Sequence, residues 1–328
     1  MEVTLTIPAL GIDVSKDTLD VNIIIRGKER RQHFANSADG WASLLSWLRQ
    51  NRVERVHACL EATGRYSMGA ALALHDAGHV VSVVNPAQIR DFARSRLGRN
   101  KTDQFDAAQI RDFASLMAPK PWTPPSPALR RLCELHTMRA GFMASLVEWK
   151  NRSGSGLDDA TAQTLAQSTI QHFTAQIKAV DQAIYQTIND DDDLHGKRDL
   201  LLSISGVGDI LAAVLLAQLP GPDVLKTAAQ AVAYAGLNPR QHQSGSSVHQ
   251  PTRISRIGNA KLRTALFMPA MVAMRFNPVI AAFVTRLRER GRLKGKQIVV
   301  AAMRKLLVIC FGVLKSGKPF DPAIAMAA

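Results

Sequence analysis

The sequence predicts a mixed α/β domain at the N-terminus, a pair of long helices in the middle and a mostly α-helical domain at the C-terminus. Short strand-like runs fill the first third of the chain, and residues 119–127 then carry five prolines, which mark a stiff linker. Helical periodicity dominates the rest. We therefore place the domains at residues 1–122, 123–195 and 196–328.

The N-terminal domain is expected to alternate between strands and helices. Residues 9–35 are expected to form a meander of three strands: 9–14 is a short apolar run holding one acid, 19–25 alternates and is β-branched, and 31–34 can return as the third. Residues 36–37 can cap the helix that follows. Two further strands are expected at Val56–Glu61 and His79–Val84, with a helix at Tyr66–Ala77 between them. An antiparallel meander followed by alternating helices and strands indicates a mixed α/β sheet.

Two long amphipathic helices are expected after the linker, at Ala128–Lys150 and Thr161–Ile188. The segment Ser153–Gly156 supplies a turn between them, so the pattern predicts an antiparallel pair. Such pairs serve as spacers or as partner-binding coiled coils. The acidic run Asp190–Asp193 is expected to be a solvated loop.

The C-terminal domain combines helices with two segments of special composition. Leu200–Leu211 follows a helix, Gly-x-Gly, helix pattern, which fits either a phosphate-binding helix-hairpin-helix or a plain turn between helices. Arg240–His249 is rich in serine and is expected to be a polar loop. Helices at Lys261–Met274 and Gln297–Leu314 are separated by a basic loop at Arg286–Lys296.

The net charge of +14 is concentrated in the last quarter of the chain. Between Arg240 and Lys318 there are 16 lysine and arginine residues and one acid, Glu289, so this block carries +15 and the remainder −1. A one-sided basic block is typical of a surface that binds nucleic acid phosphates, and a solvated basic face is the alternative. Residues 88–101 form a second basic arm with the same two interpretations.

The cysteines and the hydrophobic segments point to the cytoplasm. Cys59, Cys133 and Cys310 lie far apart and form no CxxC pair, which argues against a zinc site or a disulfide framework. No stretch reaches the roughly 18 consecutive apolar residues of a membrane span, and the N-terminus lacks a basic signal region. We expect a cytoplasmic protein without a membrane segment.

The acids Asp103 and Asp106 are three residues apart, directly after Thr102, which can cap a helix. Both carboxylates then lie on one helix face, where like charges repel. A bound Mg²⁺ relieves this repulsion, since it prefers oxygen ligands. The simpler alternative is that acids favour the first turn of a helix because of its dipole.

Two further acids fall where a carboxylate is costly to bury: Asp13 inside the first predicted strand and Glu61 at the end of the fourth. Strand ends meet the N-termini of helices in α/β sheets, so these acids and the helical pair can form one cluster. Such a cluster can hold two Mg²⁺ ions about 4 Å apart, which support the attacking and leaving oxygens on phosphorus. Asp17, Asp20 and Asp112 are expected to be solvated, and Asp20 is the nearest substitute ligand.

Three serines in the polar loop are candidate nucleophiles: Ser244, Ser246 and Ser247. A serine hydroxyl needs a base or a metal to become reactive, and His242 and His249 are candidate proton acceptors. The composition of the segment alone favours an ordinary loop, and the residues leave the choice among the serines open.

Several motifs follow one another in a characteristic order. They are Gly11–Lys16, Glu61–Gly64, Asn85–Pro86, Asn100–Ala107, Gly236–Pro239, Ser244–Ser247, Met268–Ala270 and Leu314–Gly317. In this order the chain resembles the DEDD transposases of the insertion sequence 110 family, and the resemblance covers nearly the whole chain.

This resemblance implies an RNase H-like, RuvC-like fold for the N-terminal domain. It implies that Asp13, Glu61, Asp103 and Asp106 bind Mg²⁺, two ions being expected. It also implies that Ser244 attacks a DNA phosphate and forms a covalent phosphoserine link.

The resemblance further implies a recombinase guided by a structured bridge RNA, which pairs with both donor and target DNA. Dimers are expected to assemble into a tetramer through the helical pair acting as a coiled coil. Active sites are expected to be composite, with carboxylates and serine from different subunits. The protein is then expected to work at the nucleoid of a prokaryotic cell.

Two other functions remain open from the residues alone. A metal-dependent nuclease of the RuvC type would use the four acids and leave the serine idle. A non-catalytic nucleic-acid-binding protein would use only the basic block, and its acids would be structural.

Overall fold

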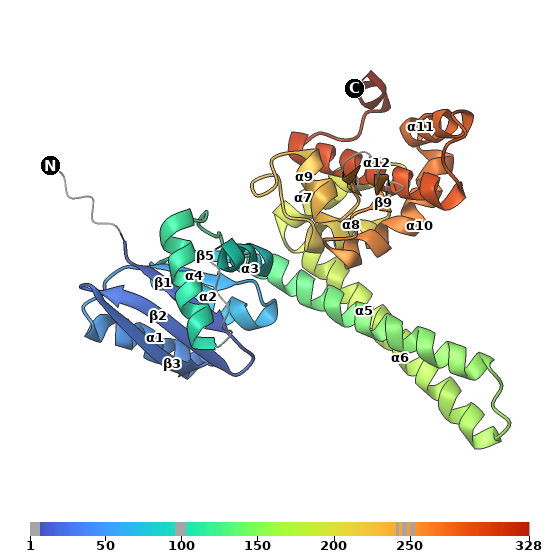
Figure 1. The fold of residues 1–328 in the computed structure, drawn as a ribbon. Coiled ribbons are helices and arrows are strands. Elements are labelled where there is room, and N and C mark those ends of the chain that lie inside the picture. The colour runs from blue at the N-terminus through green and yellow to red at the C-terminus, as the bar shows by residue number, and fades with distance from the viewer. Residues whose placement is uncertain (1–6, 96–102, 241–242, 245–247, 250–252, 328) are drawn as a thin grey trace. The chain divides into compact units, whose positions relative to one another are not determined.

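The computed structural model describes residues 7–95, 103–240, 243–244, 248–249 and 253–327. The chain divides into two compact units, Met1–Pro124 and Pro125–Ala328 (Figure 1). Each unit has a hydrophobic core of its own.

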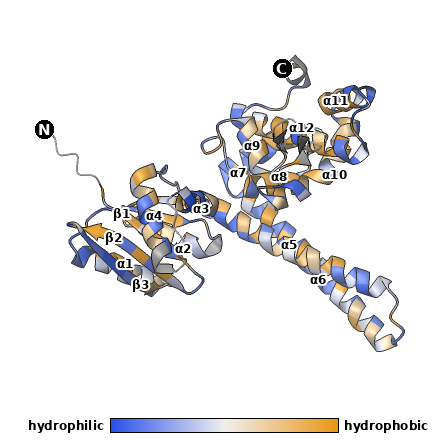
Figure 2. Ribbon diagram, in the orientation of Figure 1, coloured by the Kyte–Doolittle hydropathy of each residue, from blue (hydrophilic) through white to orange (hydrophobic). Residues whose placement is uncertain are grey.

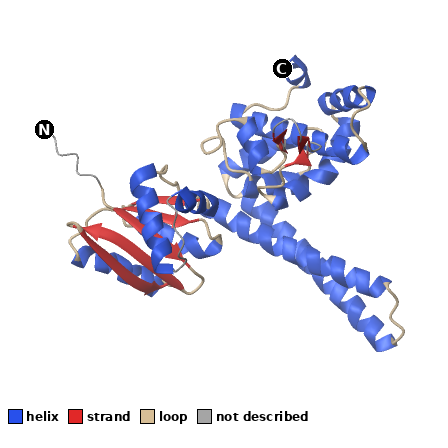
Figure 3. Cartoon of the chain, in the orientation of Figure 1, coloured by secondary structure: helices blue, strands red, loops and turns tan. Residues whose placement is uncertain are grey.

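The first unit is a five-stranded sheet with helices on both faces. Its elements are β1 (Ala9–Val14), β2 (Thr18–Ile25), β3 (Lys28–Ala35), α1 (Ala38–Gln50), β4 (His57–Glu61), α2 (Arg65–Asp76), β5 (Val80–Val84), α3 (Pro86–Ser95) and α4 (Asp103–Met117). The strand order is β3-β2-β1-β4-β5: β1, β2 and β3 form an antiparallel meander, and β4 and then β5 are added in parallel on the other side of β1. Figure 3 draws the strands in red. The predicted mixed α/β sheet is confirmed.

The alternation of side chains along β1 separates two layers of packing. Leu10, Ile12 and Val14 are buried in the larger cluster, which includes residues of α1 and α2. Gly11 and Asp13 point to the opposite face, which α4 covers. The first unit is therefore a sheet between two helical layers, and the acid of β1 lies on the α4 side.

Local caps explain why the helices of this unit begin and end where they do. The Ser37 side chain accepts a hydrogen bond from the Gly40 amide at 3.3 Å and caps α1, as predicted. Gly78 follows α2 with φ +84°, a left-handed conformation that glycine adopts without strain. The predicted cap at Thr102 lies outside the described residues.

The second unit is almost entirely helical. Its elements are α5 (Pro127–Gly154), α6 (Ala160–Asn189), α7 (Asp192–Leu202), α8 (Asp209–Gln218), α9 (Ala228–Tyr234), β6 (Pro239–Arg240), β7 (Gln243–Ser244), β8 (Val248–His249), β9 (Arg253–Ile254), α10 (Ala260–Phe276), α11 (Pro278–Glu289), α12 (Gly295–Ser316) and α13 (Pro322–Ala327). The helical character expected of the C-terminal region is confirmed.

The helices α5 and α6 lie side by side, and hydrophilic and hydrophobic residues are mixed along both (Figure 2). Arg139 of α5 donates from Nε to Asp181 of α6 at 2.5 Å, and Phe142 packs near Phe173. α5 continues through Gly154, so the connecting turn lies slightly later than predicted. The helical pair is present, and its use as a coiled coil for assembly stays a prediction.

Two segments of the second unit differ from the sequence-based prediction. The acidic run predicted as a loop begins α7 instead, because Asp191 caps this helix by accepting from the Leu194 amide at 3.0 Å. A basic loop was predicted at residues 286–296, but its first residues belong to α11, a helix that the sequence did not predict. Asn277 accepts from the amides of Val279 and Ile280 and so starts α11.

The closing helix α12 is long and apolar enough, by composition, to cross a membrane. Half of its apolar window is buried within the protein, however, and Leu306, Leu307 and Phe311 are almost completely enclosed. α12 packs against α9, α10 and α11, so it is the central core helix of the second unit.

Candidate active site

Two of the predicted site acids end neighbouring strands. β1 and β4 are parallel, and Ile12 lies opposite Leu60 in their register. The next residues, Asp13 and Glu61, therefore stand side by side on the same sheet face, each directly after a fully buried residue. Both side chains are partly buried. The strands deliver the two carboxylates to one end of the sheet, next to α4.

A glycine on β1 allows α4 to approach the sheet closely. A Cβ atom at Gly11 would lie 2.1 Å from the Ala107 carbonyl oxygen and 2.3 Å from the Arg111 amide nitrogen. No other residue fits this position without moving the helix backbone. The close approach brings the first turn of α4, with Asp106, toward the end of β1 and Asp13.

The electrostatics of Glu61 show that three acids share this end of the sheet. Burial raises the pKa of Glu61, and the negative charges of Asp13 and Asp106 raise it further, while Arg90 on α3 opposes them. Asp103 opens α4 one turn before Asp106. The Asp103 side chain lies outside the described residues.

The donor atoms available here are carboxylate oxygens, which suit Mg²⁺. Acids that raise one another's pKa in a half-buried site are stabilised when a divalent cation binds between them. Among the side chains that the structure describes, no group of three acid, histidine or cysteine residues is already at metal-binding spacing. The residues thus fit a divalent metal in kind and location.

The sheet face beside these acids contains further charged residues. Asp20 on β2 lies opposite Asp13, and its Oδ1 atom is 3.0 Å from His33 Nδ1. Asp112 accepts hydrogen bonds from the Arg111 side chain at 2.6 and 3.0 Å. The prediction that Asp20 and Asp112 are simply solvated is wrong, because each pairs with a basic side chain.

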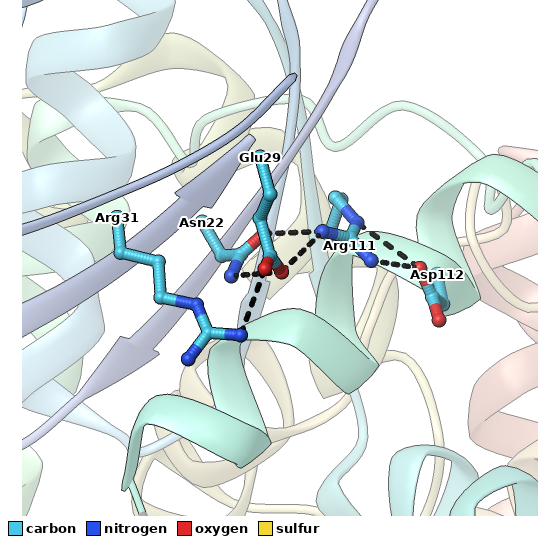
Figure 4. A network of polar contacts seen from close by, with 5 residues as sticks. All are labelled: Asn22, Glu29, Arg31, Arg111 and Asp112. Carbon is cyan, nitrogen blue, oxygen red and sulfur yellow. Dashed lines mark hydrogen bonds and ion pairs between the residues drawn. The ribbon is translucent and has the colours of Figure 1, made fainter. Parts of the chain in front are cut away.

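A network on the same face involves residues that sequence reasoning missed. Arg111 of α4 donates to Asn22 on β2 and to Glu29 on β3, and Glu29 also accepts from Arg31 (Figure 4). Asn22 is completely buried. The one sequence signal was an arginine among apolar residues of a helix, one turn after the acidic pair.

Cys59 lies two residues before Glu61 on β4, beneath the acids. Burial, together with the charge of Glu61, raises the pKa of its thiol to about 12. It belongs to a small apolar cluster with Ile89 of α3 and Ile110 of α4. Its role is packing, because a neutral thiol is neither a good metal ligand nor a nucleophile.

The predicted serine segment forms a short hairpin in the second unit. Ser244 ends β7 and lies opposite Val248 of β8, while Gln243 lies opposite His249. The pair β6 and β9 forms a second two-residue ladder at the base of the segment. The sequence predicted a polar loop without these ladders. The side chains of Ser244 and His249, and residues Ser246, Ser247 and His242 altogether, lie outside what the structure describes.

The base of this hairpin is held by specific hydrogen bonds. The Ser255 hydroxyl donates to Asn238 Oδ1 at 2.7 Å, and its amide donates to the Asn238 carbonyl at 2.9 Å. Arg263 of α10 donates to the Ala235 carbonyl at 2.9 Å. Gly258 allows the chain to pass the Tyr234 carbonyl, which a Cβ atom would meet at 2.3 Å. The hairpin therefore rises from an ordered base.

The Gly-x-Gly turn between α7 and α8 is used for packing. Gly206 has φ +102°, and a Cβ atom there would lie 2.7 Å from the Ala273 Cβ atom of α10. Asn277 donates to the Ser205 carbonyl at 3.2 Å. The close approach at Gly206 is to another helix of the protein, which favours the plain interhelical turn.

Comparisons with known proteins agree across both units. Residues 10–162 match the DEDD family of IS110 transposases, described as "Transposase", and residues 198–285 match the family described as "Transposase IS116/IS110/IS902 family". The chain is 33% identical over 318 residues to the pilin gene-inverting protein of Moraxella bovis, covering 96% of this chain and 98% of that protein.

A second relative is the IS110 uncharacterized 43.6 kDa protein of Streptomyces coelicolor. It is 32% identical over 168 residues, which is 51% of this chain and 40% of that protein. Matches to both family regions, together with a full-length relative above 30% identity, settle the assignment. The chain belongs to the IS116/IS110/IS902 family of transposases and is an enzyme that cuts and rejoins DNA.

Proposed function

We propose that the protein is the transposase of an insertion sequence, which cuts and rejoins DNA with metal-binding carboxylates and a serine nucleophile. A structured bridge RNA would guide it to donor and target DNA. The observation that carries the proposal is the placement of Asp13 and Glu61 side by side at the end of the sheet, where the charges of Asp13 and Asp106 raise the pKa of Glu61. Neighbouring carboxylates repel one another, and a divalent cation bound between them relieves this repulsion. A cation held in this way is suited to phosphoryl transfer.

The acids Asp13, Glu61, Asp103 and Asp106 would hold the metal, two Mg²⁺ ions being expected. When bound, the metal supplies stabilisation of negative charge on the oxygens around phosphorus. The protein's own part is to fix the carboxylates at the strand ends and at the first turn of α4. Gly11 supports this role, because it sets the separation of β1 and α4.

Ser244 would be the nucleophile. Its hydroxyl oxygen would form a bond to phosphorus and lose its proton to a base, while one P–O ester bond breaks and a strand end leaves as a hydroxyl. The reverse reaction with another strand end rejoins the DNA. Its place at the end of β7, directly before the tip of a hairpin, supports this role. Ser246 and Ser247 remain alternatives, and His242 or His249 would accept the proton.

Nucleic acid would bind the basic residues of the second unit. Arg288, Arg290 and Arg292 are exposed at the junction of α11 and α12, close to Lys294 and Lys296. Contacts of this kind are made to phosphates and carry no sequence information, so base pairing with the RNA would supply specificity.

The assembled form would contain several copies of the chain. The helices α5 and α6 would act as the coiled-coil spacer, residues 123–195, between a RuvC-like domain at 1–122 and a transposase domain at 196–328. Dimers would associate into a tetramer with composite sites. The exposed apolar side chains of Val147 on α5 and Leu165 on α6 support an additional partner for this pair.

The main alternative is a metal-dependent nuclease that cuts without a covalent intermediate. The relative from Moraxella bovis is named a pilin gene-inverting protein, and inversion requires that cut ends be rejoined. Because that relative matches this chain over 318 residues, rejoining is favoured over simple cleavage.

The test is to purify the protein with the nucleic acid that it retains, to sequence that nucleic acid, and to use it to design labelled DNA substrates. Wild-type protein should form a protein–DNA adduct that survives denaturation, and Ser244→Ala should not. Ser246→Ala and Ser247→Ala are the matched controls from the same hairpin. Cleavage without any adduct would establish the nuclease alternative, and an adduct lost only in a control variant would move the nucleophile.

A further inference from the structure

Arg111 lies on α4, and its side chain is only 12% exposed. Its guanidinium group donates to three different side chains (Figure 4). Nη1 donates to Asn22 Oδ1 at 2.5 Å and to Glu29 Oε1 at 3.0 Å, and Nε and Nη2 donate to Asp112 Oδ1. A cation enclosed in this way is held in one orientation, because a planar guanidinium offers its donors in a rigid fork.

The acceptors on the sheet are themselves fixed. Asn22 is completely buried on β2 and lies opposite Gly11, and its amide donates to Glu29 Oε1 at 3.0 Å. Hydrogen bonds from Asn22, then from Arg31 and Arg111, lower the pKa of Glu29 although burial opposes them. Glu29 therefore stays ionised and joins β3 to α4 through Arg111.

This network sits where α4 comes closest to the sheet. The Arg111 amide nitrogen is one of the atoms that a Cβ at Gly11 would strike. On the β4 and β5 side, α4 is held by apolar packing of Ile110 and Phe113 around Cys59. On the β2 and β3 side, Arg111 makes polar contacts with Asn22 and Glu29. The two sets of contacts together fix the rotation of α4 about its axis.

The rotation of α4 decides where its acids point. Asp106 lies five residues before Arg111, or about 7.5 Å along the helix axis at 1.5 Å per residue. A small rotation of α4 at Arg111 therefore turns Asp106 away from Asp13. Metal coordination tolerates displacements of only a few tenths of an ångström.

We propose that Arg111 is a positioning residue for the metal site. Through Asn22 and Glu29 it sets the rotation of α4 on the sheet, so that Asp106 faces Asp13 and Glu61. The inference rests on the proposed function, because it takes these acids to be metal ligands. Arg111 itself touches neither metal nor DNA.

The test compares Arg111 with a matched ion pair elsewhere. Arg139 joins α5 to α6 through Asp181 in the second unit, and its side chain is 18% exposed. Full-length variants Arg111→Met, Arg111→Lys, Arg139→Met and Arg139→Lys are titrated with Mn²⁺ alone. The readouts are the thermal midpoint in chelator, the Mn²⁺ concentration that gives half of the maximal thermal shift, and the isothermal heat of Mn²⁺ binding.

A positioning role predicts a selective loss of metal binding. Arg111→Met should raise the half-saturating Mn²⁺ concentration by about tenfold or more, the range expected when a supporting contact behind metal ligands is removed. Arg111→Lys should raise it about threefold, because an ammonium group keeps the charge without the fork. Both Arg139 variants should lower the thermal midpoint in chelator and leave the Mn²⁺ midpoint within about twofold of wild type.

The opposite result is equally clear. If the Arg111 variants lower the thermal midpoint but bind Mn²⁺ as wild type does, the residue is only structural and the inference is overturned. If Arg111→Met does not fold, Arg111→Lys and Glu29→Gln decide by the same readout. If wild type and Asp106→Asn respond identically to Mn²⁺, the proposed metal site itself fails, which is distinct from a failure at Arg111 alone.

Discussion

The carboxylate site and the serine hairpin are built in different ways. Asp13 and Glu61 each follow a fully buried residue of a five-stranded sheet, and α4 is packed against that sheet at backbone distance. Ser244 belongs to a ladder in which the two residues of β7 pair with the two residues of β8. Metal ligands must be held rigidly, whereas a nucleophile that reaches another strand gains from a small projecting hairpin. The comparison teaches that the candidate metal ligands lie on long, well-packed elements, whereas Ser244 lies on a strand of two residues.

The base of the serine hairpin, unlike its short strands, is held by several specific hydrogen bonds. Asn238 and Ser255 bind each other through both side chain and backbone, and Arg263 fixes the preceding turn. These contacts fix the point from which the serine segment leaves the helical domain, although the strands of the segment are very short. In the proposed chemistry, the carboxylates and the serine both depend on ordered residues that support them without reacting themselves.

The largest effect on activity is expected from substitutions at the carboxylate site. Asp13→Asn and Asp106→Asn should each reduce DNA cleavage by about 10³-fold or more, because an amide cannot replace a charged metal ligand. Asp17→Asn, an exposed acid in the turn after β1, is the control and should cleave as wild type does. Cleavage of labelled DNA is measured with each variant. Equal activity in all three would show that the acids are structural.

The next effect tests the close approach of β1 and α4. Gly11→Ala should cost about 2–4 kcal/mol in the free energy of unfolding and abolish Mn²⁺ binding, because the added methyl group meets helix backbone. Gly141→Ala on α5 is the matched control. It has open space around it, so it should be neutral or stabilising by about 0.5–1 kcal/mol. Denaturant titration measures both, and a stable, metal-binding Gly11→Ala would contradict the packing argument.

A smaller effect is expected at the base of the hairpin. Asn238→Ala removes the closer of the two acceptors of the Ser255 hydroxyl, which lie at 2.7 and 3.4 Å, and this should cost about 1 kcal/mol. The rate of covalent adduct formation should fall by about tenfold, since the serine is aimed less well. Mn²⁺ binding should be unchanged, because the carboxylates lie in the other unit. Adduct formation at the wild-type rate would show that the base does not orient the nucleophile.

The basic junction of α11 and α12 should affect binding more than catalysis. Replacing Arg288, Arg290 and Arg292 together by glutamine should make the slope of log affinity against log salt shallower by about 2 to 3, roughly one for each lost phosphate contact. The control is Arg49→Gln, an exposed arginine of the first unit, which should keep the slope. Filter binding with DNA and with RNA gives both slopes. An unchanged slope would place the nucleic acid elsewhere.

The smallest effect concerns the stability of the carboxylate site without metal. The pKa of Glu61 is raised above 4.5, so its ionisation costs stability as the pH rises from 4.5 through the folded value. Glu61→Gln should therefore raise the thermal midpoint at pH 7 in chelator by about 2–5 °C, and this gain should vanish near pH 4. Thermal melts at both pH values check the sign. A less stable variant at pH 7 would mean that the acids do not repel one another.

The same contrast explains what the sequence could predict. The strands of the sheet are visible as apolar or β-branched runs, which the structure shows to span five to eight residues, and the acids stand out within or at the end of such runs. Strands of two residues, such as β7 and β8, are too short to show such a run, so the hairpin around Ser244 was predicted only as a loop. α11 was missed because its start depends on a cap and a proline at Asn277 and Pro278.

Long-range polar contacts were the other limit. Arg111 binds Asn22, which is 89 positions away in the chain, and nothing local in either segment indicates the pairing. Asp112 was expected in water for the same reason. The positions of the candidate metal ligands on strand ends followed from pattern, whereas the side chains that orient their helix emerged only from the folded structure.

The close approach at Gly11 also keeps the spacing of β1 and α4 independent of the packing in the opposite layer of the sheet. Since α4 touches β1 through main-chain atoms, no interchangeable side chain lies between the ligands of the two elements. Substitutions in the opposite layer, around Leu44 and Leu74, would then weaken the fold while leaving ligand spacing almost untouched. That layer could therefore change widely in sequence during evolution or be redesigned, provided that Gly11 is kept.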